Sequence, residues 1–313
     1  LERAQDKEMA SRRAAALLPK ISAWHDWFYR ARDPEQTGLV AIIHPWESGR
    51  DNSVDWDDAF ERVPTEGVEE FQRRDLHHAN PAHRPTQEQY KRYIWLVQLF
   101  RGLDWDSTKL HDASPFRVVD PGFNAILLRS SQDLAAMAEQ LGEPELAAKE
   151  RARADKGLEA INNLWSEKRQ QYLCLDRTNG ELIDSPSIGG LLPVFAHIDK
   201  EHSTAIARHI DALGEKVKYL VPSHDPNDVH FDPARYWRGP SWLIVNYMIS
   251  DGLKREGHHA TAERIVRDSV KLIEIGGFAE YFDPLTGEPC GGLHFTWTAA
   301  MVIEFLKLTG EVA

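Results

Sequence analysis

With 313 residues, 37 of them basic and 49 acidic, the chain carries a formal net charge of −12, which argues against nucleic acid and membranes as partners because both attract basic surfaces. No apolar run approaches the roughly 20 residues of a membrane span and no signal-type segment opens the sequence, so a cytoplasmic location is the default expectation. The two cysteines, Cys174 and Cys290, are too few for a disulfide framework and lack the spacing of a metal site.

Eight segments have the apolar spacing of helices. Pro121, Pro144 and Pro240 stand where a first helical turn would begin, and Pro19 is expected to kink or restart the first helix. No linker rich in Ser, Gly or Pro divides the chain, so we expect a single domain over residues 1–313. The eight helices are expected at Leu17 to Phe28, Tyr90 to Phe100, Pro121 to Met137, Pro144 to Trp165, Ile206 to Leu213, Pro240 to Leu253, Ile265 to Ile273 and Val302 to Leu306.

Strand signals are few and short. Residues 172–176 and 181–184 flank Asn179-Gly180, a pair that is typical of a hairpin turn. Strands this scarce cannot build a core, so we expect an all-α fold in which helices pack on helices. Small residues are frequent in several helices, and aromatic and charged residues lie in the connections. This distribution favours a helical toroid with its chemistry on the loop face.

The segment from His44 to Ser53 is the most informative stretch for function. It crowds Trp46, an arginine, and the carboxylates of Glu47 and Asp51 into one turn-rich segment. A sugar ring presents C–H faces that stack on Trp, and a glycosidic oxygen leaves only when a carboxylic acid protonates it. The segment therefore indicates a sugar-cleaving site, and the alternative is a solvated loop whose Trp packs into the core.

Two later segments also combine aromatic rings with polar groups. The first packs Tyr236, Trp237 and Trp242 around a helix start, where the rings face either a common cavity or a neighbouring helix. The second places Glu280 between aromatic residues after a pair of glycines, and a little further on Trp297 lies at another helix start. Both segments are candidates for the same site as the first.

These motifs, taken in this order, resemble glycoside hydrolase family 63, and within that family the bacterial mannosylglycerate and glucosylglycerate hydrolases. The resemblance covers essentially the whole chain and implies an (α/α)6 barrel, an inverting mechanism and no metal cofactor. Such a barrel needs more helices than the eight expected here, and the chain opens without Met. We therefore expect the first helices of the barrel to be absent, which would expose apolar faces and favour a homo-oligomer.

The resemblance also assigns roles to individual residues. Asp51 matches the general acid, and Glu280 matches the general base that activates water. Arg84 and Tyr90 lie in a segment that resembles the one clamping the glycerate carboxylate. The residues expected to contact the sugar are Trp46, Glu47, Tyr236, Trp237, Trp242 and Trp297.

Inverting hydrolysis needs two carboxylates in opposite protonation states, about 6.5–9.5 Å apart with room for a water. Asp51 must stay protonated. Because Arg50 beside it would lower the pKa of Asp51, burial or the nearby acids Glu47 and Asp55 must outweigh that effect. Glu280 must be ionised to take a proton from water, so we expect a polar partner among its aromatic neighbours.

A basic cluster favours an anionic substrate over a neutral one. Guanidinium groups bind a carboxylate with two parallel hydrogen bonds, and Arg73, Arg74 and Arg84 lie close together in the sequence. We therefore expect a small anionic glycoside, glucosylglycerate or mannosylglycerate, as the substrate. The histidines at 77, 78 and 83 near Asp75 lack a convincing metal-binding pattern, so no metal and no cofactor is expected.

Three other functions remain open at this stage. An α-glucosidase acting on other disaccharides or oligosaccharides would have less use for the arginine cluster. A sugar epimerase on a similar helical toroid would depend on histidine bases rather than on Asp51 and Glu280. A sugar-binding protein without catalysis would hold saccharide in the Trp-rich loops, although the presence of both carboxylates argues against it.

Overall fold

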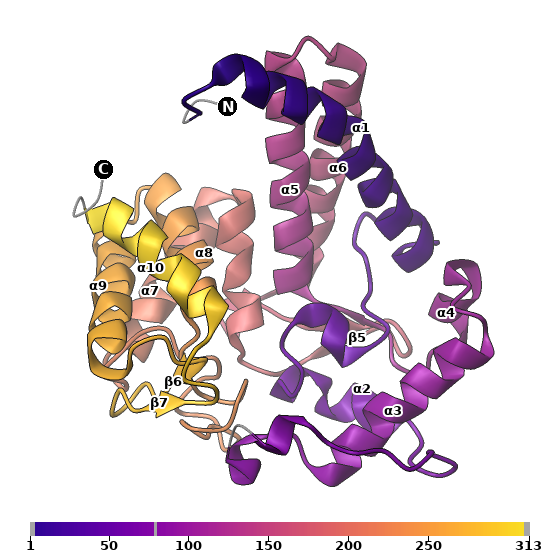
Figure 1. Cartoon of the computed structure of the whole chain (residues 1–313), viewed down its shortest axis with the longest axis vertical. Helices are drawn as coiled ribbons and strands as arrows, with labels where there is room; N and C mark the ends of the chain where they lie inside the picture. Colours follow the sequence, from indigo (N-terminus) through magenta and orange to yellow (C-terminus); the bar gives the residue numbers. More distant parts are fainter. Residues whose placement is uncertain (1–3, 78–79, 310–313) are drawn as a thin grey trace.

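The computed structural model describes residues 4–77 and 80–309, and most of these residues are helical (Figure 1). The all-α prediction is therefore confirmed at this level. The helices are α1 (Lys7–Arg32), α2 (Asp57–Glu61), α3 (Gln87–Gly102), α4 (Ser107–Ala113), α5 (Pro121–Gln140), α6 (Pro144–Ile161), α7 (Lys200–Leu213), α8 (Leu243–Arg255), α9 (His259–Gly276) and α10 (Thr296–Thr309). None of the described helices is both long enough and apolar enough to cross a membrane.

All eight predicted helices are present, and their ends show which sequence signals were reliable. Pro121 and Pro144 occupy the first positions of α5 and α6, as expected. The predicted start at Pro240 is wrong, because the helix begins at Leu243 and Ser241, one of the two residues between them, pairs with a strand. Pro19 lies inside α1, which runs through it without a restart. The two additional helices, α2 and α4, have only five and seven residues, too few for periodicity to show.

Figure 1 shows one group of helices around α5 and a second group around α8 to its left, with α2, α3 and α4 at the lower right. In the first group α5 packs against both α6 and α1, and in the second α8 packs against α9 and α10. Gly157 on α6 permits the closest approach in the first group, because a Cβ atom there would lie 2.2 Å from Leu128 Cδ2. A larger side chain would push α5 and α6 apart.

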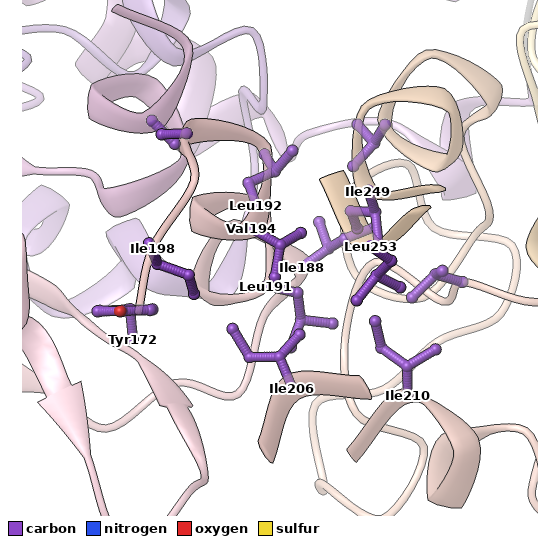
Figure 2. Close-up of a cluster of buried hydrophobic side chains, with 14 of the residues drawn as sticks. Tyr172, Ile188, Leu191, Leu192, Val194, Ile198, Ile206, Ile210, Ile249 and Leu253 are labelled. Carbon is purple, nitrogen blue, oxygen red and sulfur yellow. The ribbon is translucent and has the colours of Figure 1, made fainter. Parts of the chain in front are cut away.

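A buried apolar cluster joins the two groups. Its centre is a pair of 3-10 helices, Ile188–Gly190 and Leu192–Ala196, which pack against α5 and α8. Figure 2 shows side chains from this segment beside those of α7 and α8. The residues labelled there are Tyr172, Ile188, Leu191, Leu192, Val194, Ile198, Ile206, Ile210, Ile249 and Leu253.

The strands are short and serve to shape loops rather than to build the core. The predicted hairpin is present as β4 (Cys174–Asp176) and β5 (Glu181–Ile183), with Gly180 at φ +77° in the turn, and β1 (Val118–Val119) pairs with β4. The strand pairs β2 (Trp165–Ser166) with β3 (Gln171–Tyr172), and β6 (Tyr281–Phe282) with β7 (Pro289–Cys290), form two smaller sheets. Trp165 therefore lies in a strand beyond α6, which ends at Ile161, and not in the helix predicted for it.

Candidate active site

Asp51 lies in a tight loop that two buried side chains hold in place. The loop follows a 3-10 helix, Pro45–Ser48, which ends at Gly49 with φ +72°. The Tyr93 hydroxyl from α3 donates a 2.7 Å hydrogen bond to the backbone oxygen of Asp51, and the Trp56 indole donates a 2.6 Å bond to that of Arg50. Backbone anchors on both sides fix the direction in which the Asp51 carboxyl points.

Burial raises the pKa of the Asp51 carboxyl to about 6 and outweighs every other effect on it. The positive charge of Arg84 and a hydrogen bond from the Tyr236 side chain act in the opposite direction, while the negative charge of Glu280 raises the pKa further. A carboxyl with this pKa is protonated far more often near neutral pH than an exposed aspartate, as a general acid must be. Of the two influences that the sequence offered, burial and the nearby acids Glu47 and Asp55, burial has the largest effect on the pKa of Asp51.

Arg50 does not act on Asp51 as its position in the sequence suggested. Its guanidinium points into the core, where it donates 2.6 Å and 2.8 Å hydrogen bonds to Asp55 and Asp120, and a 3.2 Å bond to the Ser187 hydroxyl. All of these groups are buried. Arg50 is thus neutralised by its own partners and ties the Asp51 loop to the start of α5.

Glu280 lies where the chain leaves α9 and enters β6. It is 8% exposed, and its Oε2 accepts a 3.0 Å hydrogen bond from the Gly292 N–H. Gly291, at φ +73°, permits this approach, because a Cβ atom at that position would lie 2.4 Å from Glu280 Oε2. The loop that follows β7 is therefore shaped around the Glu280 carboxylate.

Arg84 is the polar partner that the sequence required of Glu280. Its Nη1 lies 3.2 Å from Oε1, and its Nη2 lies 2.7 Å from Oε2, a bidentate pair in which both side chains are about one tenth exposed. The same guanidinium lies 4.5 Å from the centre of the Tyr236 ring. Asp51, Tyr236, Arg84 and Glu280 thus form one continuous cluster, which brings together the two carboxylates predicted to act as acid and base.

The segment before α8 is hydrogen-bonded to Asn52, the residue that follows Asp51. The Trp237 N–H donates to the Asn52 side-chain oxygen at 3.1 Å, and the Arg238 Nε donates to the Asn52 backbone oxygen at 2.9 Å. Arg238 also forms a bidentate pair with Asp57 at the start of α2. Tyr236 itself has φ +45°, an unfavourable conformation for a side chain of this size that such surrounding contacts can impose.

Trp237 and Trp242 belong to the core and are not placed as sugar platforms. Each is 2% exposed, and the two indoles stack on one another with ring centres 3.9 Å apart. The other face of Trp242 packs near the Tyr281 ring. This burial contradicts the prediction that both rings lie against a sugar. The alternative of an aromatic helix entry packed on its neighbours explains them, since the same residue types serve either purpose.

Other predicted contacts fall at different distances from the cluster. Trp46 is 40% exposed and lies against the Tyr93 ring, with Tyr90 at its edge. Burial, together with the charges of Asp75 and Asp51, raises the pKa of Tyr90 to about 12, so Tyr90 lies within electrostatic reach of the acid. These two rings line the approach to Asp51 from the α3 side.

Glu47 and Trp297 are placed by contacts that do not involve the cluster. The Glu47 carboxylate accepts a 2.7 Å bond from Arg32 on α1 and another from the Ile43 N–H. Trp297 is 47% exposed on the first turn of α10, beside the Phe295 ring. Among the predicted substrate contacts, Tyr236, Arg84, Tyr90 and Trp46 are therefore better placed than these two.

Several donors around the cluster lack a partner in the part of the chain that the structure describes. They are buried, and all belong to residues that contact Asp51, Tyr236 or Glu280, or that neighbour them in the chain. Buried polar groups are normally satisfied, so these four donors are available to a ligand that carries hydroxyl groups. The donors are Asn52 Nδ2, Arg84 Nε, Trp237 Nε1 and the Tyr281 hydroxyl.

Two groups of histidines lie near acidic residues. The side chain of His77 and all of His78, from the group near Asp75, lie outside the described residues. In the other group His224 is 1% exposed, and its Nε2 lies 3.1 Å from an Asp228 oxygen that is also 2.9 Å from His230 Nδ1. His230 Nδ1 is hydrogen-bonded to the Asp228 oxygen, whereas His224 Nε2, although close to it, has no hydrogen-bond partner among the described residues.

The chain matches a family model and several named relatives along nearly its whole length. A family model described as the mannosylglycerate hydrolase MGH1-like glycoside hydrolase domain matches residues 1–298. The chain is 45% identical to mannosylglycerate hydrolase MGH1 of Selaginella moellendorffii over 310 residues, which cover 99% of this chain and 64% of that protein. It is also 45% identical to a mannosylglycerate hydrolase of Thermus thermophilus, covering 98% of this chain and 74% of that one.

A solved structure has the same arrangement of the backbone. The crystal structure of a GH63 mannosylglycerate hydrolase from Thermus thermophilus in complex with Tris and D-glycerate matches with a TM-score of 0.94 and 43% identity. The match covers 98% of this chain and 74% of that one. Our chain thus spans somewhat under two thirds of the Selaginella relative and about three quarters of the Thermus structure.

Proposed function

The chain belongs to the mannosylglycerate hydrolase MGH1-like glycoside hydrolase family, and on that premise we propose that it hydrolyses mannosylglycerate to mannose and glycerate with inversion at the anomeric carbon. Glucosylglycerate is the alternative substrate, because the orientation of one sugar hydroxyl distinguishes the two hexoses. The relatives named above carry the mannosyl name at 45% identity, which favours mannose.

One observation carries the proposal: two buried carboxyl groups that share a cluster but have different partners. Asp51 is buried, and its pKa is raised to about 6, whereas Glu280 is paired with a guanidinium and a backbone N–H. A protonated acid and an ionised base are the two states that inverting hydrolysis needs at once. The opposite environments of the two carboxyls supply them.

We assign the chemical steps accordingly. Asp51 donates its proton to the glycosidic oxygen as that bond breaks and the glycerate hydroxyl forms. Glu280 takes a proton from a water molecule, whose oxygen bonds to the anomeric carbon on the opposite face of the ring. The Tyr236 hydroxyl orients the Asp51 carboxyl. One water is consumed. Asp51 ends the step without its proton and Glu280 ends it with one, so the total number of protons on the two carboxyls is unchanged.

The anionic half of the substrate accounts for the arginine near the acid. Arg73 already forms a bidentate pair with Asp75 beside Tyr90, whereas Arg84 pairs with the catalytic base. We assign Arg84 and Tyr90 to the glycerate carboxylate, and Trp46 to the sugar. The Thermus structure with D-glycerate supports this choice of aglycone by similarity.

The finer architecture belongs to the same proposal. We assign the ten described helices to an (α/α)6 barrel, because the backbone matches the Thermus hydrolase at a TM-score of 0.94. The cluster then lies where loops at one end of the barrel converge. Placement of residues 1–313 in a single domain, the cytoplasmic location and association into a homo-oligomer stay predictions from the sequence.

The test is incubation of the purified protein with mannosylglycerate, glucosylglycerate and neutral α-disaccharides, with the products followed by proton NMR. We expect fastest release from mannosylglycerate, and the β-anomer of mannose to be observed first. Initial release of the α-anomer would exclude inversion. Hydrolysis of neutral disaccharides at an equal rate would contradict the choice of a glycerate aglycone, and the Asp51→Asn variant controls for contaminating glycosidases.

A further inference from the structure

Arg84 links the proposed base to the proposed acid through its contacts with Glu280 and Tyr236. Its guanidinium bonds to Glu280 at 2.7 Å and 3.2 Å and covers the ring of Tyr236, whose hydroxyl bonds to Asp51. The chain of contacts from acid to base therefore runs through the Arg84 side chain. In inverting hydrolysis that interval holds the sugar ring and the attacking water. Sugar and guanidinium cannot occupy it together.

We propose that Arg84 is a plug that the aglycone carboxylate removes: the incoming carboxylate takes the guanidinium from Glu280, which opens the sugar position and uncovers the base at the same time. This inference rests on the proposed function, and it concerns how that site selects an anionic substrate. It assigns to Arg84 a second role beyond holding glycerate.

The surroundings of Arg84 suit a movement of the side chain alone. Its backbone is held, because the Arg84 N–H bonds to the Pro81 oxygen and Thr86 caps α3 two residues later. Its guanidinium has an unused edge, since Nε is buried and has no hydrogen-bond partner among the described residues. A second carboxylate can engage this edge as the side chain begins to move, so that the bonds to Glu280 are exchanged rather than simply lost.

Charge explains why only an anionic aglycone would do this well. Withdrawing Arg84 without a substitute would leave two unpaired charges in a site where both side chains are about one tenth exposed, which is strongly unfavourable. A carboxylate on the substrate supplies the replacement partner. A neutral aglycone offers none, so Arg84 stays on Glu280 and the sugar position stays filled. The site would thus select substrates that carry a carboxylate, because only these let the sugar enter its position.

Transfer of Arg84 from Glu280 to the substrate carboxylate would also raise the pKa of Asp51, which favours the protonated form that a general acid needs. The positive charge of Arg84 lowers the pKa of Asp51, opposing the larger effect of burial. Moving that charge onto a carboxylate of the substrate removes this opposition. Asp51 is then protonated over a wider pH range in the complex than in the free enzyme. One side-chain movement would prepare both the acid and the base.

Calorimetric titration of free D-mannose and D-glucose tests the proposal, with and without saturating D-glycerate. For the native protein, we expect D-glycerate to tighten binding of the preferred hexose by roughly 5- to 150-fold, the usual range of coupling between two sites, and the hexose to tighten glycerate binding equally. In Arg84→Gln, the hexose should bind tightly alone, and glycerate should no longer change its affinity. The control, Arg62→Gln, removes an arginine paired with Asp176 and should behave like the native protein.

The outcomes separate this inference from the function on which it rests. Hexose binding that is independent of glycerate in the native protein overturns the plug, and this readout does not depend on the folding of any variant. Weaker hexose binding in Arg84→Gln, despite a circular dichroism spectrum like that of Arg62→Gln, overturns it too. A native protein that hydrolyses mannosylglycerate without coupling refutes only the plug. One that hydrolyses no glycerate glycoside refutes the proposed function as well.

Discussion

Replacing Tyr236 by Phe should move the alkaline limit of activity to higher pH. The Tyr236 hydroxyl bonds to the Asp51 carboxyl and lowers its pKa, against the burial that raises it to about 6. A hydrogen bond to a charged group is worth about 1.5–3 kcal/mol, which corresponds to roughly 1–2 pKa units. Because the proposed mechanism uses Asp51 in its protonated form, kcat/KM is expected to fall above the pKa of Asp51. A higher pKa therefore shifts that fall from about pH 6 to about pH 7–8.

The assay is the pH profile of kcat/KM for mannosylglycerate, with released mannose as the readout. At pH 7 about one tenth of Asp51 is protonated if its pKa is 6, and about nine tenths if it is 8. Relative to its own maximum, the variant should thus retain up to about tenfold more activity at pH 7. The control, Tyr172→Phe, removes a hydroxyl bonded to His202 far from Asp51 in the chain. An alkaline limit that stays in place, or moves to lower pH, would refute the reasoning.

Three further results are expected. Asp51→Asn and Glu280→Gln should each keep the native circular dichroism spectrum and lose about 10²–10⁴-fold in kcat, and near-normal turnover in either would reassign its role. Gly291→Ala should reduce kcat because the new Cβ displaces the Glu280 carboxylate. The control, Gly180→Ala, has a similar φ and open space around it, so it should lower only the stability measured by urea unfolding. Equal kcat values in the two variants would contradict the close approach of Gly291 to Glu280. Burial raises the pKa of Glu150, but hydrogen bonds from His25 and Ser22 on α1, together with the charge and hydrogen bonds of Arg153, outweigh it and hold the pKa near 2. Glu150→Gln should therefore lose up to about 3 kcal/mol at pH 7, and the difference should vanish as the pH falls from about 4.5 to about 2. A difference that persists below that range would contradict the linkage.

Features carried by local sequence could be predicted well. Helices as long as α5 and α9 show their apolar face every three or four residues, and the turn at Asn179-Gly180 identifies its hairpin. The short α2 and α4 escaped notice because one or two turns contain too few residues for a period. Caps set the helix ends, and the start at Leu243 depends on a pairing between Ser241 and a strand that is distant in the sequence.

Individual residues of the candidate site could be predicted from the sequence, but the contacts between them could not. Motifs and a family resemblance singled out Asp51 and Glu280, and the structure brings their surroundings together. The bond between Arg84 and Glu280 joins residues 196 positions apart, and no local pattern reports such a pair. Adjacency was misleading for Arg50, whose side chain turns away from Asp51. Residue type was misleading for Trp237, because an indole suits a buried stack as well as a sugar.

The buried arginine at position 50 has a consequence for protein engineering. Its carboxylate and hydroxyl partners come from three separate stretches of the chain, at residues 53–55, 120 and 187. Removing one member of such a set leaves a charge stranded away from water, so the members must change together or not at all. A designer who transplants the acid-bearing loop onto another scaffold would have to carry all three stretches with it.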